Sequence, residues 1–191
     1  MNEAQKLVLE SKMEEFLAFR RALTDESDRG CALFAGSYLE QEIKALLKAH
    51  LASSDEENWD AALERELFKN GPLSSLAACT SLAFYSGYIS VDLRQELNQI
   101  RKIRNKFAHS SAPVAFDSPD VADWCRELKF SYWKRDDRPR GHFTAAAAGV
   151  LRQLHLLEVT AVPAQRRDSR APTEEEKGTQ RLALANAMPN R

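Results

Sequence analysis

Apolar residues recur at intervals of three and four positions along most of the chain, and polar residues fill the positions between them. This period matches one face of an α-helix, whereas strands would show β-branched or aromatic residues alternating with polar ones. Such alternating runs are missing from the sequence. The pattern therefore predicts an all-α fold, a single-domain helical bundle with about four long helices and several short ones.

Local start and stop signals divide this bundle into elements. Long helices are expected at about 2–22, at 26–52 after Thr24-Asp25, from Ser74 or Ser75 to about Gly87, and at 91–109 after Ser90. Shorter helices are expected near 59–68 and 120–130, and a last packed helix at 143–158. Serine, threonine and aspartate cap helix N-termini, and glycine favours C-termini. The inner side of the first helix is predicted to carry Leu7, Leu9, Met13, Phe16, Leu17 and Leu23.

The composition changes near residue 160. Beyond it the chain is rich in Pro, Arg, Glu and small residues, with little apolar content before LALANAM. The sequence therefore predicts a helical domain over 1–159 and a disordered tail over 160–191. A chain of 191 residues is long enough for one substantial core and does not require a second domain.

Composition narrows the classes of function. The 27 Lys and Arg residues balance 28 Asp and Glu, so any contact with nucleic acid must be local. No basic recognition helix is present, so direct DNA binding is not expected. Cys31, Cys79 and Cys125 lack metal or disulfide spacing, and no apolar run is long enough for a bilayer. We therefore expect a cytoplasmic protein with no membrane span, no cofactor and no metal.

The segment RKIRNKFAHS, residues 101–110, carries the most unusual polar residues. On a helical wheel Arg104 falls inside the apolar stripe of its helix, whereas Asn98, Arg101, Asn105 and His109 follow a separate polar line. Arg104 and His109 diverge by roughly 140° on an ideal helix. A joint site then requires the last turn to unwind or a second subunit to supply the missing partner.

A guanidinium held among apolar neighbours is costly unless it is paired. The 26–52 helix carries two acids within its apolar arc, Asp28 and Glu42, and the sequence predicts that Arg104 pairs with one of them. The acids are roughly 21 Å apart along the helix, so one guanidinium cannot reach both. Glu42 would be the partner if the two helices run parallel, and Asp28 if they run antiparallel. Asp28 and Arg29 have an alternative role in capping and solvating the first turn.

Four blocks of the chain, taken in order, resemble the mannitol operon repressor (MltR) family of bacterial proteins. The blocks are SDRGCALFAGSYLEQEIKALLKAHL, GPLSSLAACTSLAFYSGYIS, DLRQELNQIRKIRNKFAHS and RPRGHF, and the likeness runs from about residue 24 to 158. The resemblance implies an all-helical protein without a DNA-reading helix-turn-helix. It also implies a regulator of a sugar-alcohol operon that acts through a partner.

Within the third block, RNKFAH is also similar to the R-x4-H signature of the HEPN superfamily. Many of these helical proteins are metal-independent ribonucleases that act as dimers, so the resemblance implies Arg104, Asn105 and His109 as catalytic candidates. The histidine would move protons at the 2′-hydroxyl and the leaving oxygen, and the arginine would stabilise charge on the phosphate. The structural alternative makes Arg104 an ion-pair residue and His109 a partner of helix-end carbonyls.

The sequence thus favours a homodimeric regulatory protein that binds a protein or RNA partner. The alternative is a HEPN-type endoribonuclease of a toxin or antiviral system. Candidate partner-binding residues are Asp28, Arg29, Arg101, Trp133, Arg138 and Arg140. The last three belong to a basic loop in which Trp133 would stack on single-stranded RNA. Asp136 and Asp137 in the same loop favour a solvated role instead.

Overall fold

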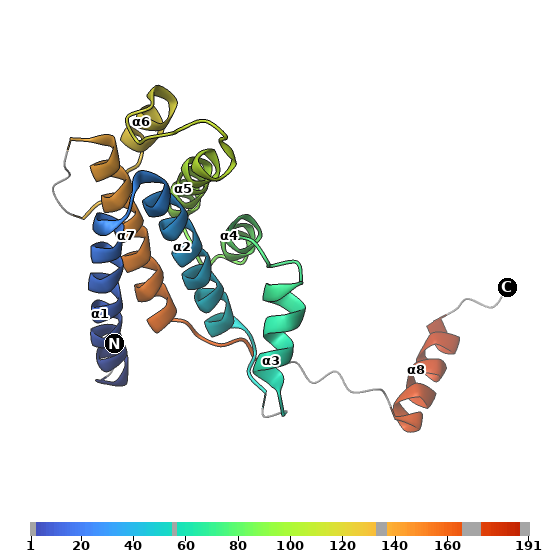
Figure 1. Ribbon diagram of the computed structural model, residues 1–191. Helices are drawn as coiled ribbons and strands as arrows, with labels where there is room; N and C mark the ends of the chain where they lie inside the picture. The colour runs from blue at the N-terminus through green and yellow to red at the C-terminus, as the bar shows by residue number, and fades with distance from the viewer. Residues whose placement is uncertain (1–2, 55–56, 133–136, 166–172, 188–191) are drawn as a thin grey trace.

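A computed structural model describes residues 3–54, 57–132, 137–165 and 173–187 (Figure 1). All regular elements in these ranges are helices, which confirms the predicted all-α bundle. In chain order they are α1 (Glu3–Asp25), α2 (Asp28–His50), α3 (Trp59–Leu63), the π-helical segment η1 (Glu64–Lys69), α4 (Leu76–Tyr85), α5 (Val91–His109), α6 (Pro119–Arg126), α7 (Pro139–Val159) and α8 (Glu174–Ala187).

Serine side chains define where three of the helices begin. The hydroxyls of Ser75 and Ser90 accept hydrogen bonds from N–H groups in the first turns of α4 and α5. Ser27 does the same for α2, so the start signal is Ser27 and not the predicted Thr24-Asp25. A free N–H in the first turn needs such an acceptor, and Ser27 is the residue in extended conformation just before the helix. Gly87, with φ of 77°, follows α4 as expected.

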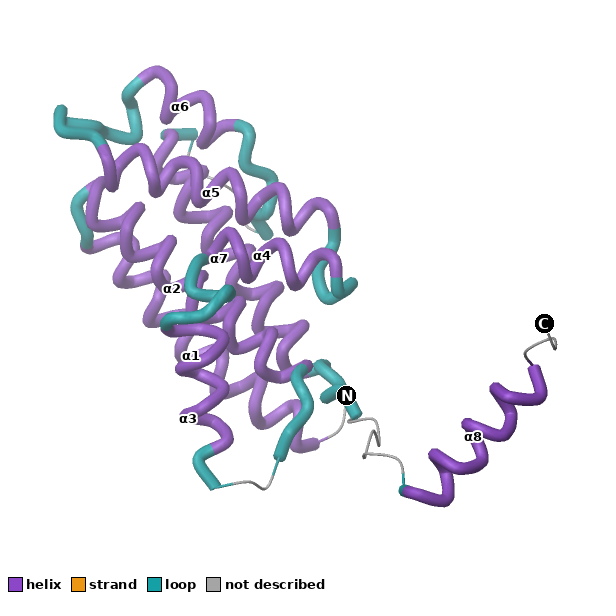
Figure 2. Tube along the Cα trace, turned by 90° about the vertical axis from the view of Figure 1, so that its right-hand side faces the viewer, coloured by secondary structure: helices purple, strands orange, loops and turns teal. Residues whose placement is uncertain are grey.

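The central helix of the bundle is α2, which packs against α1, α4, α5 and α7 (Figures 1 and 2). The helix α7 also packs against α1, α5 and α6. Small residues on α2 and α7 let their neighbours pack close to these two helices. These residues are all buried: Cys31, Ala32, Ala35 and Gly36 on α2, and Ala146, Ala147, Ala148 and Gly149 on α7. The buried side chains form one hydrophobic core, as a single-domain bundle requires.

The helix α1 buries a narrower face than predicted. Phe16, Phe19 and Leu23 are at most 3% exposed, whereas Met13 and Leu17, expected inside, are 40% and 47% exposed. Leu7 is likewise exposed, and the side chain of Leu9 lies outside the described residues. The physical reason is the position of α1 at the edge of the bundle, where α7 and α2 cover one side of it. The prediction was therefore wrong for about half of this face.

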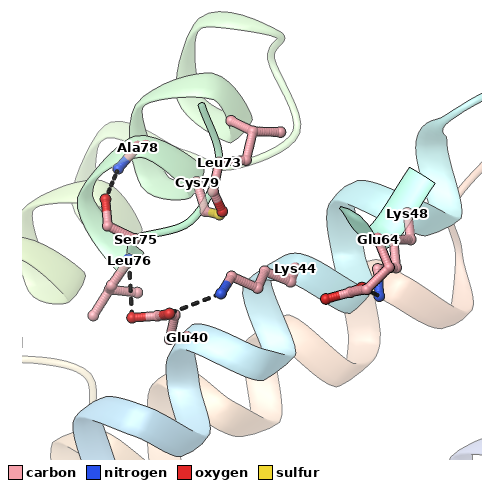
Figure 3. A network of polar contacts seen from close by, with 9 residues as sticks. All are labelled: Glu40, Lys44, Lys48, Glu64, Leu73, Ser75, Leu76, Ala78 and Cys79. Carbon is pink, nitrogen blue, oxygen red and sulfur yellow. Dashed lines mark hydrogen bonds and ion pairs between the residues drawn. The ribbon is translucent and has the colours of Figure 1, made fainter. Parts of the chain in front are cut away.

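The N-terminus of α4 is fixed to α2 by one carboxylate. Figure 3 shows Glu40 of α2 accepting hydrogen bonds from the Lys44 ammonium at 2.8 Å and from the Leu76 N–H at 3.1 Å. Leu76 is the first residue of α4, so Glu40 satisfies one of the N–H groups that a helix start leaves free. This anchor holds α4 beside α2, and α4 in turn packs against α5.

The region after residue 160 contains the helix α8, which Figure 1 draws apart from the bundle. Before it, the N–H of Ala164 donates to the carbonyl of His50 at 3.0 Å. The division of the chain at residue 160 and the disorder of the tail stay predictions. Among the helices of the described ranges, none combines the length and apolar character needed to cross a membrane.

Candidate functional site

Asp28 and Arg140, two of the predicted partner-binding residues, bind each other. Arg140 Nη1 lies 2.9 Å from Asp28 Oδ1, and its Nη2 donates to the carbonyls of Leu23, at 3.0 Å, and Glu26. The other carboxylate oxygen of Asp28 accepts the N–H of Phe116 at 3.0 Å. This pair, which we call the Asp28–Arg140 anchor, joins the α1–α2 turn, the start of α7 and the loop after α5.

The anchor also connects two of the blocks that carry the family resemblance. SDRG supplies Asp28, and RPRGHF supplies Arg140, 112 positions later in the chain. Both side chains are 31% exposed, so the interaction is partly shielded from solvent. The sequence placed Arg140 in a basic loop, whereas it lies in the first turn of α7, because Pro139 begins that helix. Of the other candidates from this stretch, Arg138 is exposed and Trp133 lies outside the described residues. The arrangement indicates a structural role for the anchor.

The second acid of the α2 arc, Glu42, lies in a buried network between α1, α2 and α7. Its Oε2 is 3.0 Å from His155 Nε2 and 3.6 Å from Lys12 Nζ. The Lys12 ammonium also lies 3.3 Å from Glu15 and 3.3 Å from Glu158. His155 is fully buried. We call this set of residues the Glu42 network.

Opposing effects set the pKa values of two members of the network, Glu42 and Lys12. Burial by itself would raise the pKa of Glu42, but the hydrogen bond from His155 and the charge of Lys12 outweigh it and lower that pKa below its ordinary value of 4.5. Burial would lower the pKa of Lys12, yet the surrounding carboxylates raise it above 10.5. Glu15, Glu42 and His155 also bring ligand-type atoms within 4.8 Å of one another. Because the Lys12 ammonium already lies beside the two carboxylates, an ion-pair network describes them better than a metal site.

The structure places neither acid beside Arg104, which corrects the predicted ion pair. Arg104 Nη1 donates instead to Oδ1 of the adjacent Asn105 at 3.0 Å. The helices α2 and α5 run antiparallel, with Arg29 bound to the Ala108 carbonyl and Gly36 level with Arg104. A Cβ at Gly36 would lie 2.7 Å from Arg104 Cγ, so the missing side chain makes room for the arginine stem. The stem packs on α2, and the residue as a whole is half-buried.

Four arginines form a surface that we call the arginine face: Arg29 of α2 and Arg94, Arg101 and Arg104 of α5. Each guanidinium has a neutral neighbour. Arg94 lies over the rings of Phe84, at 4.4 Å, and Tyr85, at 5.3 Å, while Arg101 donates to Asn98 at 3.4 Å. Within the part of the chain that the structure describes, none of the four is ion-paired to a carboxylate. Since arginine keeps its proton in proteins, the face carries four uncompensated positive charges.

The arginine face continues into exposed apolar side chains. Leu82, Tyr85 and Val91 are 38%, 76% and 51% exposed, and Tyr85 is in contact with Arg94. The buried Nε of Arg101 has no hydrogen-bond acceptor among the described residues. Sequence reasoning identified three of the four arginines but missed Arg94 and Tyr85. The spacing of seven between Arg94 and Arg101 was the available signal, because it places both on one side of a helix.

The third catalytic candidate, His109, is exposed at the end of α5. Arg104 and Asn105 are brought together, but in the described ranges no hydrogen bond or ion pair connects His109 to either of them. The lack of such a bond agrees with the roughly 140° by which Arg104 and His109 diverge on an ideal helix. A joint catalytic role of the three residues therefore stays a prediction.

The cysteines offer no nucleophile. Cys31, Cys79 and Cys125 are all free, in line with their lack of disulfide spacing, and all three are buried. Burial raises the pKa of Cys31 and Cys125 to about 12 and that of Cys79 to about 11. Because the thiolate is the reactive form, these thiols are unreactive at neutral pH.

Comparisons with known proteins bear on the fold. No protein-family model matches the chain, and no curated protein matches its sequence. Among solved structures, a chain in the X-ray structure of the MtlR-HPr complex from Escherichia coli is similar, with a TM-score of 0.55 and 16% identity. The match covers 83% of this chain and 99% of that chain. The likeness establishes a shared fold, whereas membership of the mannitol operon repressor family and the HEPN-like motif stay predictions.

Proposed function

We propose that this protein is a regulatory protein that acts by binding another protein, and that the arginine face is its docking surface. The observation that carries the proposal is the set of four guanidinium groups with neutral neighbours and no carboxylate partner. Such groups are held in place by their neighbours and remain available to acidic groups of a partner. Charge-assisted hydrogen bonds of this kind are stronger than neutral ones and steer association.

Two features favour a protein partner over a nucleic acid. The chain as a whole has a formal charge of −1, so it does not attract a polyanion over long distances. The exposed Tyr85 in contact with Arg94 matches the composition of protein interfaces, in which tyrosine and arginine are enriched among the residues that contribute most binding energy. The structural neighbour is itself a protein complex, that of MtlR with HPr, and this supports the class of partner. HPr from the same host is therefore the first partner to test.

Reversing charge on the arginine face should weaken binding of the partner. The full chain would be titrated with HPr by calorimetry, where a regulatory contact is expected at a Kd of about 1–100 µM. The double variant Arg94→Glu/Arg101→Glu should raise the Kd at least about tenfold, because two attractive contacts become repulsive.

The matched control for this titration is Arg126→Glu. Arg126 carries the same charge but lies on α6 and pairs with Asp123. Its reversal should leave the Kd within about twofold of the wild type. Undiminished binding by the double variant would overturn the choice of surface, and no binding by the wild type would exclude HPr as the partner.

A second candidate function is a metal-independent endoribonuclease, and one observation favours it. Among the residues that the structure describes, no carboxylate pairs with Arg104, and it is hydrogen-bonded to Asn105. In this function Arg104 would stabilise the phosphate charge, and His109 would transfer a proton after a second subunit or a local movement brings it near.

Cleavage of RNA in EDTA distinguishes the two functions. Labelled single-stranded RNA would be incubated with the wild type, Arg104→Ala and His109→Ala. As a binding protein the chain should leave the RNA intact in all three samples, at the level of a protein-free control. Cleavage by the wild type that His109→Ala abolishes would establish the ribonuclease instead.

A further inference from the structure

The chain that follows α7 leaves the bundle beside one end of the arginine face. The N–H of Ala164 donates to the carbonyl of His50 at 3.0 Å, and the ring of His50 stacks on Tyr88 with 3.8 Å between the ring centroids. Tyr88 lies in the short connection between α4 and α5, three positions after Tyr85 and six before Arg94. The segment that leads to α8 therefore starts next to the end of the face that carries Arg94.

The helix α8 forms through its own N-terminal signals. Thr173 Oγ1 accepts the N–H of Glu176 at 3.3 Å, and Glu176 Oε2 accepts the N–H of Thr173 at 2.7 Å. This reciprocal pattern is a capping box, and it satisfies the first N–H groups of the helix without a neighbouring element. Figure 1 shows α8 apart from the bundle, so α8 is a formed helix whose sides the bundle does not cover.

One side of α8 combines an acid with a glycine. Glu175 is exposed and, within the described ranges, its carboxylate forms no ion pair. Gly178 follows three positions later, which places it on the same side of the helix. The two cations of α8, Lys177 and Arg181, fall roughly 200° and 240° from Glu175 around the helix. The side of Glu175 and Gly178 therefore carries negative charge and little side-chain bulk.

The present position of α8 does not explain its glycine. Gly178 does not have a positive φ, and a Cβ added to it would meet no atom within 4 Å. A glycine inside a helix is destabilising relative to alanine. Its missing side chain does suit the close approach of another surface.

We propose that α8 docks on the arginine face of its own chain, with Glu175 against Arg94, and there competes with the protein partner. The nine residues from Ala164 to Thr173 span at most about 30 Å, which is long enough to bring the first turn of α8 to Arg94. The exposed ring of Tyr85, in contact with Arg94, then faces the thin side of α8. The proposal rests on the proposed function for the role of this surface.

Charge decides which part of the segment makes the contact. Residues 165–172 carry three arginines and one aspartate, so a basic face does not attract them. The first turn of α8 carries three consecutive glutamates, 174–176, and their charge is complementary to the face. The docked segment is therefore α8 itself, and the residues before it act as its connection.

The distance between α8 and α5 in the full chain tests this contact. Gln95→Cys and Gln180→Cys allow one fluorescent label on each helix, and both positions are exposed. The native cysteines are buried and their pKa values are raised, so the labels react with the introduced thiols. Docking places the two positions within about 25 Å, so energy transfer should be high at low salt. Added salt should lower it, because salt screens an exposed ion pair.

Charge exchange identifies the pair. Glu175→Arg should abolish the salt-sensitive energy transfer, and adding Arg94→Glu to the same chain should restore it, because the pair re-forms with reversed sign. Gly178→Leu should also abolish it, since leucine keeps the helix but prevents the close approach. Glu66→Arg is the matched control, because Glu66 lies in an exposed pair with Arg65, and it should have no effect. Low transfer in the wild type, or transfer that tolerates Glu175→Arg, would overturn the proposal.

A separate titration shows whether the contact regulates the arginine face. If α8 covers the face in most molecules, Glu175→Arg should lower the Kd for HPr by about three- to tenfold, because the binding-competent fraction rises. An unchanged Kd together with lost energy transfer would overturn the competition. If neither protein binds HPr, the choice of HPr as partner fails, while the energy transfer still decides whether α8 docks.

Discussion

Replacing Arg140 by alanine should destabilise the fold by about 2–4 kcal/mol. The substitution leaves the Asp28 carboxylate without its cation and removes the donor to the carbonyls of Leu23 and Glu26. Removing one member of a fully buried pair costs about 3–5 kcal/mol, and the 31% exposure of both side chains reduces this figure. Urea unfolding at pH 7, followed by circular dichroism, measures the change in the free energy of unfolding.

The control for this measurement is Arg126→Ala, which removes an arginine from an exposed ion pair with Asp123. Exposed pairs contribute little, so the expected loss is below about 0.5 kcal/mol. A double-mutant cycle with Asp28→Ala should give a coupling energy of about 1–2 kcal/mol, because the two side chains contact each other. Equal losses for Arg140→Ala and Arg126→Ala would show that the anchor does not stabilise the fold.

Two sets of charged residues in this chain contrast with each other. The Asp28–Arg140 anchor and the Glu42 network pair acids with bases between helices that are distant in the sequence. Removing either partner leaves an uncompensated charge, so these residues stabilise the bundle. The arginine face has no such compensation in the described structure, and its charges add nothing to the stability of the bundle through ion pairs. This difference supports the proposed docking role of the arginine face.

Local signals in the sequence predicted both ends of α5. The α5 helix begins after Ser90 and ends at His109 as expected, because a cap and the prolines that follow it act within a few residues. The buried face of α1 was predicted less well, since apolar character alone does not tell which side of an edge helix meets the bundle. Only the packing of α1 against α7 and α2 decides that Phe19 is buried and Leu17 is exposed.

The partner of Arg104 could not be predicted for a different reason. The argument from its helical stripe assumed that the whole side chain is buried and needs an acid, whereas the residue is half-buried, its stem lies on Gly36 and its Nη1 donates to Asn105. The acids that were expected to pair with it bind Arg140 and His155, both more than 100 positions away in the chain. Such distant pairings depend on how the helices are arranged, and a pattern within one helix does not contain that information.

Replacing Glu42 by glutamine should destabilise the fold by about 1–3 kcal/mol at pH 7. The amide keeps the shape of the side chain and an acceptor for His155, but it removes the charge that faces Lys12. The pKa of Glu42 is lowered by folding, so its ionised form contributes stability above its ordinary pKa of 4.5 and loses it as the pH falls through the lower folded value. The difference in the free energy of unfolding between wild type and variant should therefore be largest at pH 7 and shrink toward pH 3.

Chemical unfolding of both proteins between pH 3 and pH 11 measures this dependence. The pKa of Lys12 is raised by folding, so its contribution is complete below 10.5 and is lost as the pH rises further. The wild type should therefore also lose stability at alkaline pH. Glu42→Gln should reduce this loss, because Lys12 then has one carboxylate fewer beside it. Glu66→Gln, in an exposed pair with Arg65, is the control and should change the free energy of unfolding by less than about 0.5 kcal/mol. A Glu42→Gln effect of the same size at pH 3 and pH 7 would mean that Glu42 acts through its shape and not through its charge.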